Sequence, residues 1–274
     1  MKFAFSTNAF RRFSLGDALD ALGEIGYCGV EIMADAPHAF PADLTDRDIA
    51  KIRKALDRNR LEISNVNAFM HHADGDTYHP SWIERDPAYR AKRVDYTLRC
   101  IDLAEKLGAP AISTEPGGPL EGLTEGEGLR FFKEGLQAVE ARARERGIRV
   151  LIEPEPGLLI ENSAQFKIFH AELDPEVFGL NFDIGHFYCV GEEPVALVRE
   201  MRGFAEHFHL EDIASTRKHY HLLPGEGAID LPGVLDALDD IGYEGYVTVE
   251  LYTYEDRPVE AARKSLAYLL NVQL

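Results

Sequence analysis

The sequence has few cysteines for its length and no long apolar run. Its three cysteines, Cys28, Cys100 and Cys189, are far apart and form no CxxC pair, which argues against a zinc ribbon or a dithiol redox centre. We expect buried thiols in a reducing compartment. No apolar run approaches the ~20 residues of a membrane-spanning helix, and the N-terminal MKFAFSTNAF is already polar at Ser6, unlike a secretory signal. We therefore expect a cytoplasmic protein without membrane contact.

Basic residues are also scarce relative to acidic ones. The chain of 274 residues carries 29 Lys and Arg against 47 Asp and Glu, a formal net charge of -18 at pH 7. Such a charge repels a phosphate backbone and provides no general electrostatic footprint for nucleic acid. The composition therefore disfavours a nucleic-acid partner and favours a small-molecule substrate.

Strand-like runs alternate with amphipathic helical stretches along the whole chain. The runs read KFAFST, GVEIMA, LEISNVN, PAISTE, VLIEPE, GLNFDI, AEHFHL and YVTVEL. Helices are predicted over residues 15–25, 46–59, 87–107, 127–146, 163–170, 194–201, 231–241 and 258–270. Eight repeats predict an α/β fold, a closed (β/α)8 TIM barrel, with a doubly wound open sheet as the alternative. No linker or composition shift marks a boundary, so residues 1–274 are predicted to form a single domain, with residues 71–86 as a loop over the active-site rim.

Four strand-like runs in the second half of the chain each lead into a potential metal ligand. These are Glu153 in RVLIEPEPG, Asp183 in GLNFDIGH, His209 in FAEHFHLED and Glu250 in YVTVELY. A carboxylate that closes a β-branched run is awkward in a core but natural at the rim of a barrel, where strand ends converge on one pocket. The pattern predicts a metal-dependent enzyme.

Three carboxylates and one imidazole make a hard, oxygen-rich donor set. Such a set suits Mn²⁺ or Mg²⁺ and accommodates Co²⁺ or Zn²⁺, but it has nothing soft to select zinc strongly. We expect one divalent ion and rank Mn²⁺ first. An isolated rim carboxylate is more often part of an ordinary salt bridge; four such residues at successive strand ends favour metal binding.

The motifs IEPEPG, NFDIGH, HFHLED, PGEGAID and VTVEL follow one another between residues 151 and 251. In this order and spacing the chain resembles the xylose isomerase-like barrels, which include hydroxypyruvate isomerase, the ketose 3-epimerases, inosose dehydratase and endonuclease IV. The resemblance covers essentially the whole length. It implies that Glu153, Asp183, His209 and Glu250 are the metal ligands and that Glu153 and Glu250 transfer protons on opposite faces of the substrate.

The resemblance also implies that His186 and Arg217 bind substrate oxygens. His72, just past the third predicted strand, and Glu115, at the end of the fourth, are predicted to point at the same face and to contact substrate. In the DNA-repair branch of the family, histidines at these two strand ends recruit extra zinc ions, and an Asp-x-His pair follows the metal histidine. This chain departs from both patterns, with Glu115 at the second position and Arg217-Lys218-His219 in place of the pair, which favours a single-metal carbohydrate enzyme.

Two further carboxylates, a pair of histidines and one glycine-containing motif lie near the predicted site residues in the sequence. Glu155 and Glu161 are expected to be solvent-facing loop residues, and one of His219 and His221 is expected to line the pocket. PGEGAID lacks the lysine of a phosphate loop and the GxGxxG spacing, so we expect a turn that leads to a helix cap at Asp230.

These observations predict a metal-dependent isomerase or epimerase that acts on a small carbohydrate through an enediolate. Dehydration of the same intermediate, as in the inosose dehydratases, is an alternative. A multi-zinc phosphodiesterase of the endonuclease IV type and a non-catalytic sugar- or metal-binding barrel are two others. The resemblance implies that dimers or tetramers are common, so a homo-oligomer is consistent with it.

Overall fold

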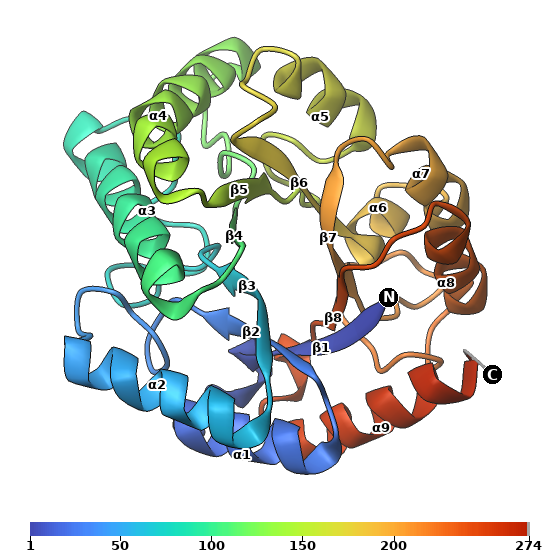
Figure 1. Ribbon diagram of the computed structural model, residues 1–274. Helices are drawn as coiled ribbons and strands as arrows, with labels where there is room; N and C mark the ends of the chain where they lie inside the picture. The colour runs from blue at the N-terminus through green and yellow to red at the C-terminus, as the bar shows by residue number, and fades with distance from the viewer. Residues whose placement is uncertain (273–274) are drawn as a thin grey trace.

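Eight parallel strands form a closed barrel in the computed structural model, which describes residues 1–272 (Figure 1). Each strand pairs with the next along the chain, and β1 closes the barrel against β8 in parallel register from Lys2 and Tyr246 to Phe5 and Val249. The predicted TIM barrel is therefore confirmed. The strands are β1 (Lys2–Ser6), β2 (Gly29–Met33), β3 (Glu62–Asn67), β4 (Ala111–Thr114), β5 (Arg149–Ile152), β6 (Phe178–Asp183), β7 (Ala205–Leu210) and β8 (Tyr246–Val249).

Helices surround the barrel on its outside, as Figure 1 shows. They are α1 (Leu15–Ile25), α2 (Asp46–Asn59), α3 (Pro87–Leu107), α4 (Glu125–Arg146), α5 (Ser163–His170), α6 (Ile184–Cys189), α7 (Pro194–Glu200), α8 (Leu231–Asp240) and α9 (Pro258–Val272). The eight predicted helices match eight of these to within two residues at each end. The sequence did not predict α6 or the 3-10 helices η1 (Thr7–Phe10) and η2 (Tyr252–Tyr254), because segments of three to six residues are too short for helical periodicity to appear.

Local sequence explains where the helices begin and end. Thr124 and Glu127 form a reciprocal capping box at the start of α4. Gly108 and Gly147 end α3 and α4 with φ angles of 79° and 64°, the left-handed conformation that glycine adopts without steric cost. Asp230 caps α8 by accepting the backbone N–H of Gly233, as predicted for the end of the PGEGAID motif.

Apolar side chains fill the space between the strands and the helices. Phe182 of β6 is fully buried, and its ring lies 4.6 Å from that of Phe187 and 5.2 Å from that of Phe208, measured between centroids. The expectation of buried thiols is correct only for Cys100. Cys28 is exposed and lies outside the apolar core, whereas Cys189 packs against the core and is only partly buried.

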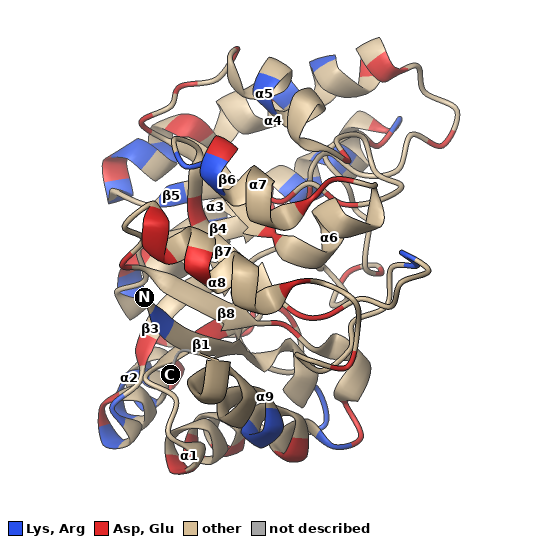
Figure 2. Cartoon of the chain, turned by 90° about the vertical axis from the view of Figure 1, so that its right-hand side faces the viewer, with Lys and Arg blue, Asp and Glu red and all other residues tan. Residues whose placement is uncertain are grey.

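Charged residues cover the outer surface. In the view of Figure 2, Lys and Arg are interspersed with Asp and Glu over the outer helices and the strand ends. Within residues 1–272, no helix combines the length and apolar character needed to cross a membrane.

Truncation of Phe182 tests the packing between barrel and helices. We expect Phe182→Ala to lower the free energy of unfolding by about 3–5 kcal/mol, because the cavity it leaves is enclosed by other side chains. Phe13→Ala is the control, since the same atoms are removed from a ring that is 37% exposed. Chemical denaturation of both variants measures the difference, and equal losses would contradict the packing described here.

Candidate active site

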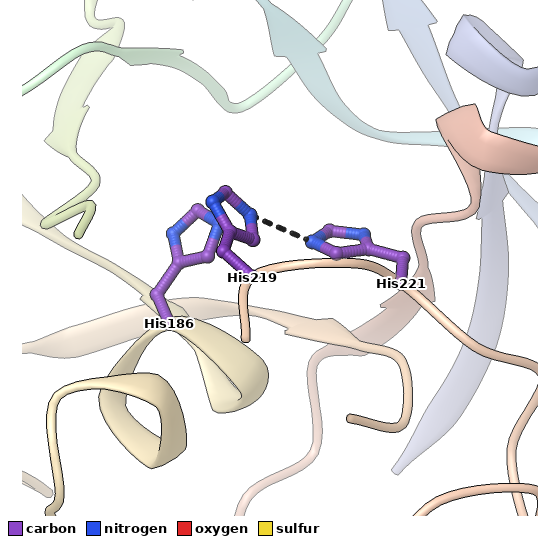
Figure 3. A group of neighbouring side chains, drawn as sticks. All are labelled: His186, His219 and His221. Carbon is purple, nitrogen blue, oxygen red and sulfur yellow. Dashed lines mark hydrogen bonds between the residues drawn. The ribbon is translucent and has the colours of Figure 1, made fainter. Parts of the chain in front are cut away.

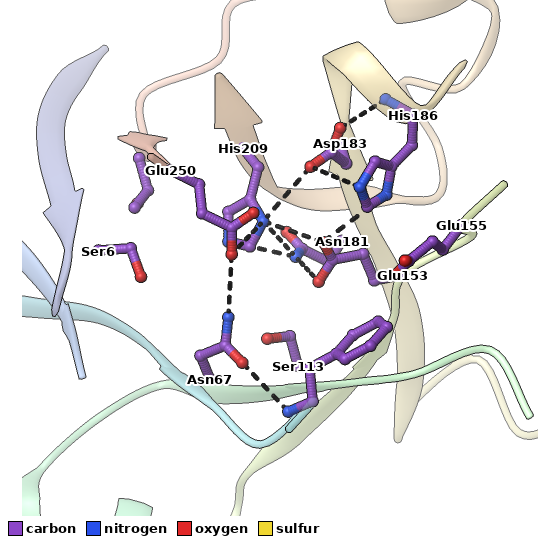
Figure 4. Close-up of polar contacts among 12 residues, drawn as sticks. Ser6, Asn67, Ser113, Glu153, Glu155, Asn181, Asp183, His186, His209 and Glu250 are labelled. Atoms are coloured by element: carbon purple, nitrogen blue, oxygen red, sulfur yellow. Dashed lines mark hydrogen bonds and ion pairs between the residues drawn. The ribbon is translucent and has the colours of Figure 1, made fainter. Parts of the chain in front are cut away.

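Four side chains converge at the carboxyl ends of the last four strands (Figure 4). Glu153 directly follows β5, Asp183 ends β6, His209 lies in β7 and Glu250 directly follows β8. One ligand atom from each lies within 4.8 Å of the ligand atoms of the others, and all four residues are buried. We call this set the four-residue cluster. The structure thus brings together the four ligands that the sequence predicts.

Asp183 connects the cluster to the fold. Its Oδ1 accepts the backbone N–H of His186 at 2.7 Å and so caps the N-terminus of α6. Its Oδ2 is buried, lacks a hydrogen-bond partner among the described residues and lies 3.7 Å from His209 Nδ1. A buried carboxylate oxygen without a donor is the kind of atom that a cation would satisfy.

The charges of the cluster are unbalanced. Burial raises the pKa of Glu153, and Asp183 adds to the rise while His209 opposes it. Burial also raises the pKa of Glu250 well above its ordinary value. Burial would raise the pKa of Asp183 too, but the neighbouring imidazoles of His186 and His209 lower it. Three carboxylates at such distances repel one another, so the donor set fits a divalent cation.

Amide side chains orient the two glutamates. Asn8 and Asn67 both donate to Glu250 Oε1, at 2.8 Å and 3.3 Å. Asn181 donates to Glu153 Oε2 at 2.8 Å. Each glutamate therefore has one oxygen fixed by an amide, and both glutamates also line the cavity described next.

A cavity of about 310 Å³ opens above the cluster. Its wall includes residues from the segment that connects β3 to α3, as expected for the loop at 71–86. The residues that line it are Asn8, Arg11, Asn67, Phe69, Met70, His72, Thr77, Tyr78, Glu153, Glu155, His186, His219, Glu250 and Tyr252. Polar groups and aromatic rings thus share a wall around a space of small-molecule size.

Two of the predicted substrate-binding residues line this cavity. His186 Nδ1 lies 3.0 Å from the carbonyl oxygen of Pro154, to which it donates, and its Nε2 lies 3.6 Å from Asp183 Oδ2. The backbone N–H of His72 donates to Asp35 Oδ2 at 2.6 Å, which holds the start of the loop beside the cavity. Both histidines thus lie at the catalytic face of the barrel, as the sequence predicts.

The other two predicted substrate-binding residues lie outside the cavity lining of the described chain. Arg217 packs over the Tyr188 ring at 4.1 Å and donates to the Tyr188 carbonyl and to Glu193, at 2.7 Å and 2.8 Å. Its guanidinium is therefore engaged by protein groups on the side of α6. The substrate contact expected for Arg217 is not supported by this position.

Glu115 lies beneath the loop and outside the cavity lining of the described residues, so its position does not support the substrate contact expected for it. Its Oε1 accepts the backbone N–H of Trp82 at 3.2 Å and lies 3.4 Å from Arg93 Nη2, and neither Glu115 nor Arg93 is exposed. Burial raises the pKa of Glu115 to about 7, against the opposing charge of Arg93. Arg93 also donates to the carbonyls of Ala68 and Phe69, so the pair anchors the loop. Glu115 is thus a structural residue beneath the loop.

The expectation that Glu155 faces solvent is wrong. Its side chain is buried and lines the cavity, and Oε1 accepts a hydrogen bond from the Tyr78 hydroxyl at 2.8 Å. Asn8 and Arg11, in the segment after β1, also line the cavity and were not predicted. The repeated glutamate in EPEPG, at the end of a strand that already supplies Glu153, was the signal that could have identified Glu155.

The imidazoles of His186, His219 and His221 form a second cluster (Figure 3). It adjoins the first, since His186 Nε2 lies 3.6 Å from Asp183 Oδ2. His219 Nε2 lies 3.2 Å from His221 Nε2, and one ring nitrogen of His186 lies within 4.8 Å of a ring nitrogen of each. His221 Nδ1 donates to the carbonyl of Glu250 at 2.9 Å. Burial lowers the pKa of His186 to about 4 and that of His221 to about 3, so both rings are neutral at pH 7. Of the pair 219 and 221, His219 lines the cavity, as expected for one of them.

Known proteins resemble this chain over nearly its whole length. A family model described as xylose isomerase-like TIM barrel matches residues 19–272. Inosose dehydratase of Lacticaseibacillus casei is 25% identical over an alignment 285 positions long, gaps included, which covers 92% of this chain and 87% of the relative. Fructoselysine 3-epimerase of Shigella flexneri is 26% identical over 273 residues, which cover 97% and 96%. The solved structure of a D-tagatose 3-epimerase-like protein superposes with a TM-score of 0.83 at 23% identity, over 100% of this chain and 97% of the other.

Removal of the Arg93 charge tests the role assigned to Glu115. We expect Arg93→Met to lower the free energy of unfolding by about 3–5 kcal/mol, because it leaves a buried carboxylate without its cation. The double variant R93M/E115Q should recover part of this loss. Arg99→Met, which breaks an exposed ion pair with Asp95, is the control and should cost about 1 kcal/mol or less. Urea titration measures all three, and an Arg93 loss as small as the control would contradict the anchoring role.

Proposed function

Because the chain belongs to the xylose isomerase-like TIM barrel family, we propose that it is a divalent-metal-dependent isomerase or epimerase of a small sugar or sugar derivative. The observation that carries the proposal is the four-residue cluster, in which ligand atoms of three buried carboxylates and one imidazole lie within 4.8 Å of one another and two of the carboxylates, Glu153 and Glu250, line a small-molecule cavity. The names of the two relatives, a dehydratase of an inosose and an epimerase of a fructose derivative, support a hydroxy-carbonyl substrate.

Glu153, Asp183, His209 and Glu250 would hold the cation. When bound, a divalent ion supplies Lewis-acid stabilisation of the negative charge that develops on substrate oxygens as a carbon-bound proton leaves. Mn²⁺ ranks first for this donor set, and Mg²⁺, Co²⁺ and Zn²⁺ also fit it.

Glu153 and Glu250 are the proposed acid–base pair. They come from β5 and β8, approach the cavity floor from two directions and both line the cavity (Figure 4). Amides fix one oxygen of each, Asn181 on Glu153 and Asn8 with Asn67 on Glu250, which orients the carboxylates. One carboxylate takes the proton next to the carbonyl carbon and the other returns a proton.

The position of the returned proton decides the product. Return to the same carbon from the other face gives the epimer, and return to the neighbouring carbon interconverts aldose and ketose. Loss of a neighbouring hydroxyl as water would give a dehydration. His186 and His72, which line the cavity, are proposed to contact substrate oxygens.

Solvent exchange tests the acid–base assignment. The wild-type protein, incubated in D₂O with a panel of ketoses and 2-keto acids, is expected to incorporate deuterium into at least one of them. In Glu250→Gln the exchange rate should fall about 10²–10⁴-fold, because an amide cannot carry the proton. Mass spectrometry of the sugars measures incorporation, and the metal content of the same samples separates lost proton transfer from lost metal.

Glu176→Gln is the matched control, since Glu176 lies on the outer surface and pairs with Arg144. It should exchange at the wild-type rate. Undiminished exchange in Glu250→Gln would refute the acid–base role, and binding without exchange on any member of the panel would favour a non-catalytic barrel.

A multi-metal phosphodiesterase is the second candidate, and the imidazole cluster of His186, His219 and His221 is the observation that favours it. By sequence spacing, the segment Arg217-Lys218-His219 occupies the place of the Asp-x-His pair of the repair branch. In the structure it is His219 and His221 that lie beside His186. The net charge of -18 opposes binding to a phosphate backbone, so we rank this function second.

Metal stoichiometry separates the two functions. Metal analysis of the purified protein by mass spectrometry should find one divalent ion per chain, and His219→Ala should keep that ion because His219 is outside the four-residue cluster. Three ions per chain, with loss of at least one in His219→Ala, would transfer the assignment to the phosphodiesterase.

A further inference from the structure

The interior of the barrel below the four-residue cluster is polar. Glu31, Asn65, Asn181, His207 and Thr248 are all buried there and hydrogen-bond to one another or to the cluster. The interior of a TIM barrel is ordinarily filled by branched apolar side chains, so a layer of buried polar groups needs a reason.

Glu31 is the charged member of this layer. Its carboxylate is fully buried, and within residues 1–272 its ion-pair partners are histidines. It accepts hydrogen bonds from Asn65 Nδ2 at 2.9 Å and from Asn67 Nδ2 at 3.2 Å, and His209 Nε2 lies 2.7 Å from its Oε2. Three convergent donors offset the free-energy cost of burying the Glu31 carboxylate.

This contact determines where the proton of His209 lies. A carboxylate has only acceptors when ionised, so His209 Nε2 must donate to Glu31. In the neutral ring, Nδ1 then carries the lone pair. That atom faces the cluster, at 3.1 Å from Glu153 Oε1 and 3.7 Å from both Asp183 Oδ2 and Glu250 Oε1.

The neighbouring histidine of β7 has a different role. His207 Nδ1 lies 2.8 Å from Asn181 Oδ1 and its Nε2 lies 2.8 Å from Thr248 Oγ1, so both of its nitrogens are occupied inside the layer. Because Asn181 Oδ1 faces His207, its Nδ2 is turned toward Glu153. Of these two β7 imidazoles, His209 alone belongs to the four-residue cluster, and Glu31 is the carboxylate that supports it.

We propose that Glu31 is a positioning residue that holds His209 in the Nε2–H tautomer, so that Nδ1 is the nitrogen that binds the divalent cation. The inference rests on the proposed metal dependence and deepens it by assigning the supporting residue and the ligand atom. A carboxylate behind a metal-bound imidazole orients the ring and raises its basicity, and loss of such a partner typically weakens metal binding 10–100-fold.

Zinc affinity tests the proposal without measuring activity. Competition with a chromogenic chelator should show that Glu31→Gln binds Zn²⁺ about 10–100-fold more weakly than the wild type. Glu115→Gln is the matched control, because Glu115 is an equally buried glutamate near a strand end that contacts Arg93 and Trp82 instead of His209. Its zinc affinity should equal that of the wild type.

Imidazole nitrogen NMR of the wild-type protein gives a second readout that needs no variant to fold. In protein labelled with ¹⁵N-histidine and loaded with Zn²⁺, the His209 ring should show a protonated Nε2 and a zinc-bound Nδ1. Zinc on Nε2, or wild-type affinity in Glu31→Gln, would overturn this inference and leave the proposed function intact. Failure of the wild-type protein to bind Zn²⁺ at all would overturn the proposed function as well.

Discussion

Mutual repulsion among three buried carboxylates is the constraint on which the site depends. Glu153, Asp183 and Glu250 approach one another, and all three side chains are buried, so bulk solvent screens their charges only weakly. Hydrogen-bond donors contact individual oxygens of these carboxylates. Asn181 serves Glu153, and Asn8 and Asn67 serve Glu250. These amides are neutral, so they orient the carboxylates without cancelling their charge, and a divalent cation would supply the compensation.

The same constraint extends into the barrel wall. The strand pairing shifts register at Val30 and Glu31 in the β2–β3 pair and at Leu180 and Asn181 in the β6–β7 pair. Such irregularities re-aim side chains next to functional sites, and here each lies at a residue that hydrogen-bonds to the cluster. Asp183 has a structural contact and a site contact at once, since one of its oxygens caps α6 and the other faces the cluster.

The fold and the four-residue cluster could be predicted because their signals are local. A β-branched run that ends in a carboxylate or histidine is visible within a few residues, and parallel strands bring such ends together. The contacts that could not be predicted join residues that are distant in sequence. Glu31 and His209 are 178 residues apart, and nothing near Glu31 indicates its partner. Glu155 is buried because Tyr78, 77 residues away, reaches over from the loop. Arg217, which the resemblance assigns to substrate, packs on Tyr188 and pairs with Glu193 instead, and its place in the sequence does not reveal these partners.

We propose above all that the four-residue cluster is a divalent-metal site. Crystals grown with Mn²⁺, measured at a wavelength where manganese scatters anomalously, test it most directly. We predict that the strongest anomalous peak lies between the carboxylate oxygens of Glu153, Asp183 and Glu250 and the Nδ1 atom of His209. A cluster without a peak in crystals that bind manganese elsewhere on the described chain would contradict the account.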